Sequence, residues 1–260
     1  MIEVSTSEWL SHANHAIDSV LKECYRHKLK DTWSENFITS RILQSLQLYS
    51  EPTRWVDEGR ISQCDMFKLT GQTEANYGDI AVFVRTWFSS TEFVDGVCFY
   101  EAKRQYFEMD ALCGFSAYSS DQMNRIAEKT GSCHAVLYDI EPEAQETWAT
   151  TLPIAHLLAF TRHTRVSNGG RGLHYHGVPF IYPVLSNILG QNLEHRKNLV
   201  DAIKDWVIRK VKFHFVISCD VWTDLDFKPT PHFTPGGKYQ KIRIASPDKK
   251  HDSTMRPPRP

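Results

Sequence analysis

Two carboxylates and a lysine stand at spacings that could support metal-assisted hydrolysis. Asp79 opens a β-branched, apolar run (79–88), and Glu101 and Lys103 lie two residues apart in the next such run (97–107). Residues two apart on a strand point to the same face of a sheet. If the two runs pair as a hairpin, Asp79 and Glu101 meet at one end, where two carboxylates repel unless a cation lies between them. Carboxylate oxygens suit Mg²⁺ or Mn²⁺, and a neighbouring lysine can orient a water or stabilise charge on a phosphate.

A third acid, Glu35, stands one helical turn before Ile38 and two before Ile42 in a predicted helix (34–49). Ile38 and Ile42 belong to the apolar stripe of that helix, so Glu35 shares the face that should meet the sheet. A carboxylate on such a face is costly unless it has a partner or a metal ion.

Each of these residues also has an ordinary structural interpretation. Glu35 could be a first-turn acid favoured by the helix dipole, and Asp79, which follows a glycine, could be a turn residue. Glu101 and Lys103 could form a same-face ion pair of little energetic value.

The elements that must position these residues follow from periodicity. Helices are predicted at 7–28 and 34–49, where apolar residues recur at three- and four-residue steps. Three strand-like runs follow these two helices, and after them come a further helix and a buried strand. From residue 34 to residue 140 the predicted order is α-β-β-β-α-β, with the last five elements at 64–69, 79–88, 97–107, 119–131 and 133–140.

Beyond residue 140 the pattern predicts a helix at 151–160, a loop at 161–177 and a helix at 192–210. Residues 178–185 are expected to form an extended edge, because their two prolines cannot donate to a ladder. A strand is predicted at 212–222. The expected organisation is a single domain over 1–227, with its core at 34–140 and an elaboration at 141–227, followed by a basic tail rich in Pro and Gly at 228–260.

Glu35, the Gly78-Asp79 pair and the sequence Glu101-Ala102-Lys103, on an α-β-β-β-α-β order, resemble the PD-(D/E)XK nuclease superfamily, although Gly78 replaces the usual proline. The resemblance covers 34–140. It implies a restriction-endonuclease-like α/β fold, a mixed central sheet flanked by helices. It further implies that Asp79, Glu101 and Glu35 bind Mg²⁺, which Mn²⁺ can replace, that Lys103 helps to activate the water, and that Gln122 on the following helix completes the site.

The resemblance leads to an expected function. We expect a metal-dependent nuclease that hydrolyses phosphodiester bonds of nucleic acid, most readily DNA. Proteins of this size with such a domain resemble restriction and anti-phage effectors, which are often oligomeric or partnered with an ATPase or a sensor. The alternative is a nuclease-like chain that serves as a binding or regulatory subunit of a larger complex.

Composition limits the remaining possibilities. The chain has 260 residues with 30 Lys and Arg against 31 Asp and Glu, so bulk charge does not favour a protein that coats nucleic acid. The tail is the exception, with eight basic and two acidic residues. No apolar run is long enough to cross a membrane and the N-terminus lacks the pattern of a secretory signal, so a cytoplasmic protein is expected. The six cysteines are accordingly expected to be free thiols, mostly buried.

Overall fold

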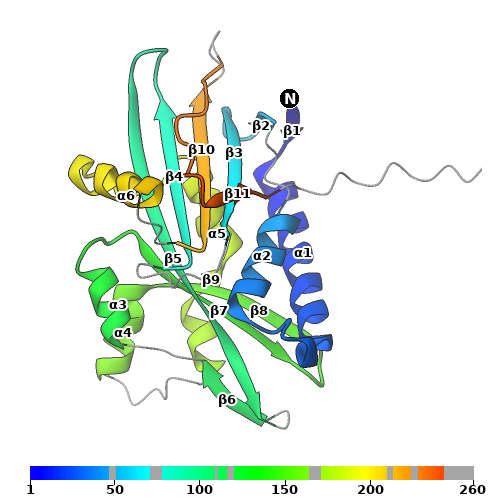
Figure 1. Cartoon of the computed structure of the whole chain (residues 1–260). Helices are drawn as coiled ribbons and strands as arrows, with labels where there is room; N and C mark the ends of the chain where they lie inside the picture. The colour runs from blue at the N-terminus through cyan, green and yellow to red at the C-terminus, as the bar shows by residue number, and fades with distance from the viewer. Residues whose placement is uncertain are drawn as a thin grey trace, which may run out of the picture.

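The computed structural model describes residues 1–46, 51–70, 78–108, 111–115, 120–163, 171–209, 213–223 and 228–242. All the described strands belong to one mixed sheet, which helices cover on both faces (Figure 1). The strands are β1 (Ile2–Val4), β2 (Thr53–Trp55), β3 (Arg60–Leu69), β4 (Ile80–Trp87), β5 (Phe93–Glu108), β6 (Ala111–Phe115), β7 (Cys133–Glu141), β8 (Glu146–Pro153), β9 (Val178–Pro179), β10 (Phe215–Thr223) and β11 (Tyr239–Lys241).

Six α-helices and two short 3-10 helices are present in the described part of the chain. None of these helices is long and apolar enough to cross a membrane. The α-helices are α1 (Thr6–Arg26), α2 (Glu35–Ser45), α3 (Ser120–Ala127), α4 (Ile154–His163), α5 (Ile181–Ile188) and α6 (Lys197–Arg209), and the 3-10 helices are η1 (Lys28–Lys30) and η2 (Arg171–His176).

The sheet has the order β1-β2-β3-β10-β4-β5-β7-β8-β9, with β11 beside β3 and β6 beside β5. The strand that follows Asp79 and the strand that carries Glu101 do pair as a hairpin: β4 and β5 are antiparallel, with Ile80 opposite Tyr100. The late strand β10 lies between β3 and β4, antiparallel to the first and parallel to the second. The mixed α/β class is therefore confirmed, whereas β3 and β4 are not direct neighbours and the restriction-endonuclease-like core stays a prediction.

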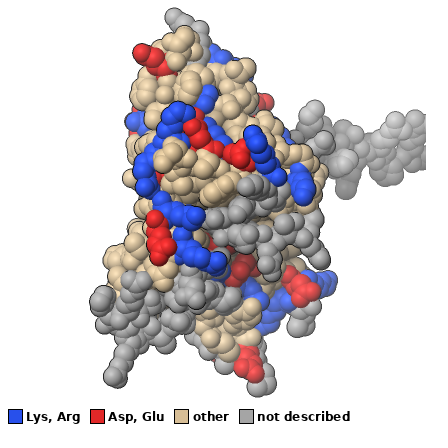
Figure 2. Space-filling view, turned by 60° about the vertical axis from the view of Figure 1, so that its left-hand side comes forward, with Lys and Arg blue, Asp and Glu red and all other residues tan. Residues whose placement is uncertain are grey.

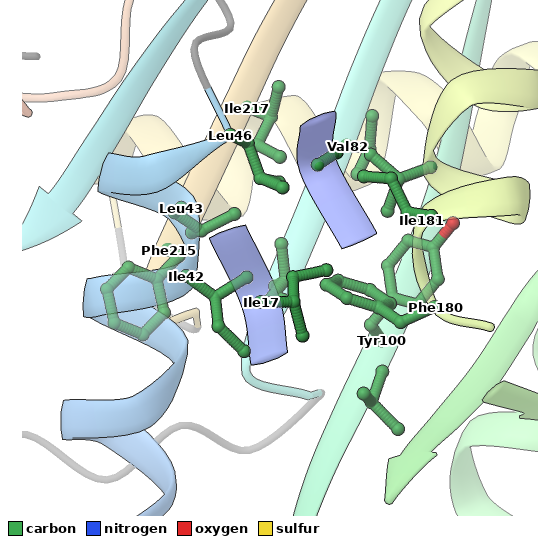
Figure 3. Packing of buried hydrophobic residues seen from close by; sticks show 14 of the residues in the cluster. Ile17, Ile42, Leu43, Leu46, Val82, Tyr100, Phe180, Ile181, Phe215 and Ile217 are labelled. Atoms are coloured by element: carbon green, nitrogen blue, oxygen red, sulfur yellow. The ribbon is translucent and has the colours of Figure 1, made fainter. Parts of the chain in front are cut away.

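Two hydrophobic cores lie on opposite faces of this sheet. Helices α1, α2 and α5 bury one face around Ile17, Ile42, Tyr100 and Phe215 (Figure 3). On the other face α3, α4 and α6 cover a second cluster that includes Phe99. Alternate residues of β5 serve alternate faces, as the pleat of a strand requires.

The structure corrects two predicted elements. The run 151–160, predicted as a helix, is divided between the end of β8 and the start of α4, because its first three residues extend the ladder with β7, which ends at Pro153. The segment 178–185, predicted as an extended edge, contains only a two-residue strand before α5. Pro183 falls in the first turn of α5, where a missing N–H donor costs nothing.

Two further segments bear on the predicted organisation. Of the predicted loop 161–177, residues 161–163 end α4 and 171–176 form η2, while 164–170 lie outside the described residues. Residues 228–242 of the expected tail contribute to the domain, because Tyr239–Lys241 pairs with β3 and Phe233 is buried. Residues 243–260 lie outside the described part of the chain.

The prediction that all cysteines are free is wrong. Cys64 on β3 and Cys219 on β10 are register partners, and a disulfide joins them. Such a bond requires two strands that only the folded sheet brings together. Cys24, Cys98 and Cys133 are free and buried, whereas Cys113 is free and exposed.

Candidate active site

The candidate residues gather where β5 lacks a neighbour on one edge. β4 pairs with β5 from Phe93 to Tyr100, and β6 pairs with it from Gln105 to Glu108. Between these ladders the edge of residues 101–104, which we name the β5 gap, has no strand partner among the described residues. The opposite edge of this segment pairs with β7. Side chains at the β5 gap can therefore contact residues that precede β4 in the chain.

Asp79 occupies this gap. Its backbone N–H donates to the carbonyl oxygen of Tyr100 at 2.9 Å, and its own carbonyl oxygen accepts from Phe215 at 2.8 Å. Its carboxylate accepts the backbone N–H of Ala102 at 2.7 Å, which satisfies a donor that the missing strand would otherwise have taken. Asp79 is thus fixed by both neighbouring strands, and its side chain is directed along the edge of β5.

The residue before Asp79 has a steric reason to be glycine. Gly78 has a φ of +119°, which residues with a Cβ rarely adopt. A Cβ there would lie 3.2 Å from the carbonyl oxygen of Tyr100 and 3.8 Å from Oε2 of Glu101. The proline typical of the resembled superfamily could not adopt this φ, which explains its absence here.

Glu101 and Lys103 are side by side on the face of β5 that looks toward α3. Both are buried, at 3% and 4% exposure, and the Lys103 ammonium donates to Oε1 of Glu101 at 2.5 Å. The predicted same-face arrangement is therefore confirmed. Because the pair is withdrawn from water, it is not the solvated surface pair of the ordinary interpretation, for which a small energy would be expected.

Glu35 approaches from the other side of the sheet. It is the first residue of α2, and Trp33, two residues earlier, donates its indole N–H to the backbone carbonyl oxygen of Gln105 on β5 at 2.9 Å. One turn further along α2, Thr39 shares a hydrogen bond of 3.1 Å with the hydroxyl of Tyr138 on β7. These two contacts hold the N-terminus of α2 across β5, beside the gap.

The charges of Glu101 and Glu35 act on both Asp79 and Lys103. Burial and then the charge of Glu101 raise the pKa of Asp79 well above its usual value, with Glu35 contributing in the same direction and the Lys103 ammonium opposing it. Burial alone would lower the pKa of Lys103, but the charges of Glu101, Glu35 and Asp79 raise it. Lys103 is therefore a cation, which can donate hydrogen bonds but cannot serve as a base.

The donor set suits a divalent cation, although the ligands are not yet assembled around one point. Across the described residues, no group of three His, Cys, Asp or Glu side chains converges closely enough to hold a metal ion. Mg²⁺ is commonly bound by only one or two carboxylates and completes its shell with water. Asp79 and Glu101 could supply such carboxylates if Glu101 released Lys103, and a cation would offset the repulsion that contributes to the raised pKa of Asp79.

The remaining expected residue, Gln122, belongs to α3, but its side chain lies outside the described residues. Two residues that the sequence argument overlooked also contribute to this region. Trp33 positions α2, and Gln105 continues the face of Glu101 and Lys103 by one more alternate position. Alternate residues of a strand share a face, so the sequence Glu-Ala-Lys-Arg-Gln could have placed Gln105 on the same face as Glu101 and Lys103. The role of Trp33, in contrast, depends on a contact between segments that are distant in sequence.

Surface charge gives no uninterrupted basic track on the face turned forward in Figure 2, where blue and red side chains are interspersed. On α6, Lys197 pairs with Asp201 and Arg209 with Asp205, both at 2.6 Å. Arg171 on η2 forms ion pairs with Asp139 and Glu141.

Comparisons with family models, with curated proteins and with solved structures found no match to this chain.

Proposed function

We propose that the chain is a metal-dependent nuclease that hydrolyses phosphodiester bonds, with DNA as the expected substrate. The observation that carries the proposal is the buried pair of Glu101 and Lys103 at the β5 gap, where the Asp79 carboxylate accepts from the backbone of the intervening Ala102. Carboxylates are rarely buried together without a function or a cation, so clustered groups of this kind favour a functional site.

In this proposal Asp79 and Glu101 hold Mg²⁺, and Glu35 adds negative charge beside it. A bound Mg²⁺ would polarise the phosphate and neutralise charge that develops on its oxygens. Lys103, held as a cation, donates hydrogen bonds to the attacking water or to a phosphate oxygen. The water oxygen forms a bond to phosphorus, the bond from phosphorus to the 3′ oxygen breaks, and a proton from the water is transferred through solvent to the departing oxygen.

The degree of burial gives each residue a place in this scheme. Glu35 and Asp79 retain some exposure to solvent, whereas Glu101 and Lys103 are buried. A dry inner part strengthens the interaction of the lysine with a negatively charged phosphate, because screening by water is reduced there.

Cleavage assays test the proposal. Plasmid and linear DNA are incubated with the wild type and with Asp79→Asn, Glu101→Gln and Lys103→Met, in Mg²⁺, in Mn²⁺ and in EDTA. Asp201→Asn, which alters an exposed carboxylate on α6, is the matched control. We expect cleavage by the wild type and the control only, and none in EDTA. Equal cleavage by all variants, or none by the wild type, would contradict the proposal.

The second candidate is a nuclease-like subunit without activity of its own. The ion pair between Glu101 and Lys103 favours it, because a carboxylate engaged by a lysine at 2.5 Å is not an open metal ligand. A purified chain that neither cleaves DNA nor binds Mg²⁺ in calorimetry would support this candidate.

A further inference from the structure

Gln105 presents a buried polar side chain that the described fold does not use. Its exposure is 0%, and among the described residues neither its amide nitrogen nor its amide oxygen has a hydrogen-bond partner. Burial of an amide without a partner carries a desolvation cost, so such a group points to a bound water or to a function. The backbone carbonyl oxygen of Gln105 is satisfied independently, by the indole N–H of Trp33.

The position of Gln105 relates it directly to the candidate site. Glu101, Lys103 and Gln105 are alternate residues of β5, so all three side chains point to one face. Lys103 and Gln105 are separated by about 6.5 Å along the strand, a distance that two long side chains can span. An ammonium has three N–H donors, and Lys103 can therefore donate to Glu101 and to a second acceptor.

A second polar side chain of the same kind lies in this corner. Phe115, the register partner of Gln105, contacts the ring of His174 at 5.5 Å between centroids. Within the described chain neither ring nitrogen of His174 makes a hydrogen bond, although Nε2 lies 3.4 Å from the buried carboxylate of Asp139. Asp139 follows Tyr138, and Gln105 follows its register partner Arg104, so both residues are one position past the end of the ladder between β5 and β7. The polar face of the site therefore extends past Lys103 toward Asp139.

We propose that Gln105 is a positioning residue of this site, and that its amide oxygen orients the Lys103 ammonium through one bound water. The inference rests on the proposed nuclease function. Glu101 alone fixes only one of the three donors of Lys103. A second acceptor from the opposite direction limits the rotation of the ammonium, so that its remaining N–H is directed to the water or the phosphate.

The competing explanation is a Gln105 that is only structural, satisfied by a trapped water. The two explanations differ in what an apolar replacement does. Methionine has nearly the shape of glutamine without its polar atoms, so Gln105→Met removes the unused polar group and retains the packing. Thr151→Val is the matched control, because Thr151 is also buried with an unpaired side-chain oxygen among the described residues, but on β8.

The experiment measures the melting temperature, and kcat and KM for linear DNA in Mg²⁺, for the wild type, Gln105→Met, Gln105→Glu and Thr151→Val. We expect both apolar variants to melt at or above the wild-type temperature, by up to about 3 °C. Gln105→Met should lower kcat about tenfold with KM within about twofold of wild type. Gln105→Glu, which retains an oxygen acceptor, should recover part of that loss, and Thr151→Val should retain full kcat.

Other outcomes overturn the inference. An active wild type with Gln105→Met at the same kcat overturns the role of Gln105 and leaves the proposed function intact. A wild type no more active than Glu101→Gln overturns both. Gln105→Leu provides a second apolar variant, and if both apolar variants melt well below the wild type, Gln105 is structural.

Discussion

The indole N–H of Trp33 donates to the backbone carbonyl oxygen of Gln105 at 2.9 Å, across 72 positions of sequence. Trp33 is buried and packs edge-on against Tyr25 at 5.3 Å, so its ring is fixed by α1 as well as by β5. Because α2 begins two residues later, this bond determines where its first residue, Glu35, can lie. The half of β5 that carries the candidate site and the helix that brings the third acid are thus held as one unit.

Trp33→Phe should weaken this unit. Phenylalanine retains an aromatic ring against Tyr25 but leaves the carbonyl oxygen of Gln105 without its donor, so we expect a loss of about 1–3 kcal/mol in the free energy of unfolding. Any DNA cleavage should fall as Glu35 loses its fixed position. Urea denaturation measures the first effect. Trp9→Phe, at a buried tryptophan that packs edge-on against Trp55, is the control, and cleavage should not change there.

The pair of Glu101 and Lys103 should show strong coupling. Lys103→Met leaves the Glu101 carboxylate buried beside Asp79 without its cation, and we expect a loss of about 3–5 kcal/mol. The double variant Glu101→Gln with Lys103→Met buries no uncompensated charge at these positions and should be more stable than Lys103→Met alone. A double-mutant cycle in urea gives the coupling energy. Losses that simply add would show that the two side chains do not interact in solution.

The local part of this arrangement could be predicted, and the non-local part could not. The parity of Glu101 and Lys103 and the run that follows Asp79 were sufficient to predict the hairpin and the shared face. Nothing local distinguishes β10 from the other apolar strands, so its insertion between β3 and β4 was not predictable. The disulfide of Cys64 and Cys219 depends on that insertion and was missed for the same reason.

Burial was the second quantity that the sequence could not supply. A mixed apolar run such as 151–160 suits both a strand and a helix, and the choice was made by the ladder with β7. Gln105 had the same parity as Lys103, but only the fold shows that it is fully buried. Sequence patterns assign faces, whereas tertiary packing decides which faces are withdrawn from water.

Asp79 should make stability depend on pH. Its pKa is raised in the folded protein above the usual value of 3.8, chiefly by burial and by Glu101. The folded state therefore keeps the Asp79 proton to a higher pH than the unfolded state does. The contribution of Asp79 to folding stability is complete below about pH 3.8 and is lost as the pH rises through the folded pKa. Asp79→Asn, which can still accept from Ala102, should match the wild type at pH 3.5 and exceed it at pH 7 in EDTA. Urea midpoints measured across this range test the sign, and a constant difference between the two proteins would contradict it.

Divalent cations should stabilise the folded wild type at pH 7, where the ionised Asp79 otherwise lowers the free energy of unfolding. A cation held by Asp79 and Glu101 binds only the folded state, so at one hundred times its dissociation constant it should add about 2.7 kcal/mol to the stability of the wild type. Asp79→Asn and Glu101→Gln remove a ligand and should respond much less. Melting curves with and without Mg²⁺ at pH 7 measure the shift, with Asp201→Asn as the control that should behave like the wild type. A shift of equal size in all four proteins would place the bound ion elsewhere.

The disulfide should be detectable by counting thiols. Of the six cysteines, Cys24, Cys98, Cys113 and Cys133 are free, so denatured protein prepared without reductant should react at four sites and reduced protein at six. The bond links residues 155 positions apart. Closure of so long a loop in the unfolded chain corresponds to roughly 5 kcal/mol of stabilisation on entropic grounds, whereas disulfides typically contribute about 2–4 kcal/mol. The double variant Cys64→Ala with Cys219→Ala should lose stability in that range and become insensitive to reductant, whereas Cys24→Ala should remain sensitive. Six reactive thiols in unreduced protein would show that β3 and β10 are held by their ladder alone.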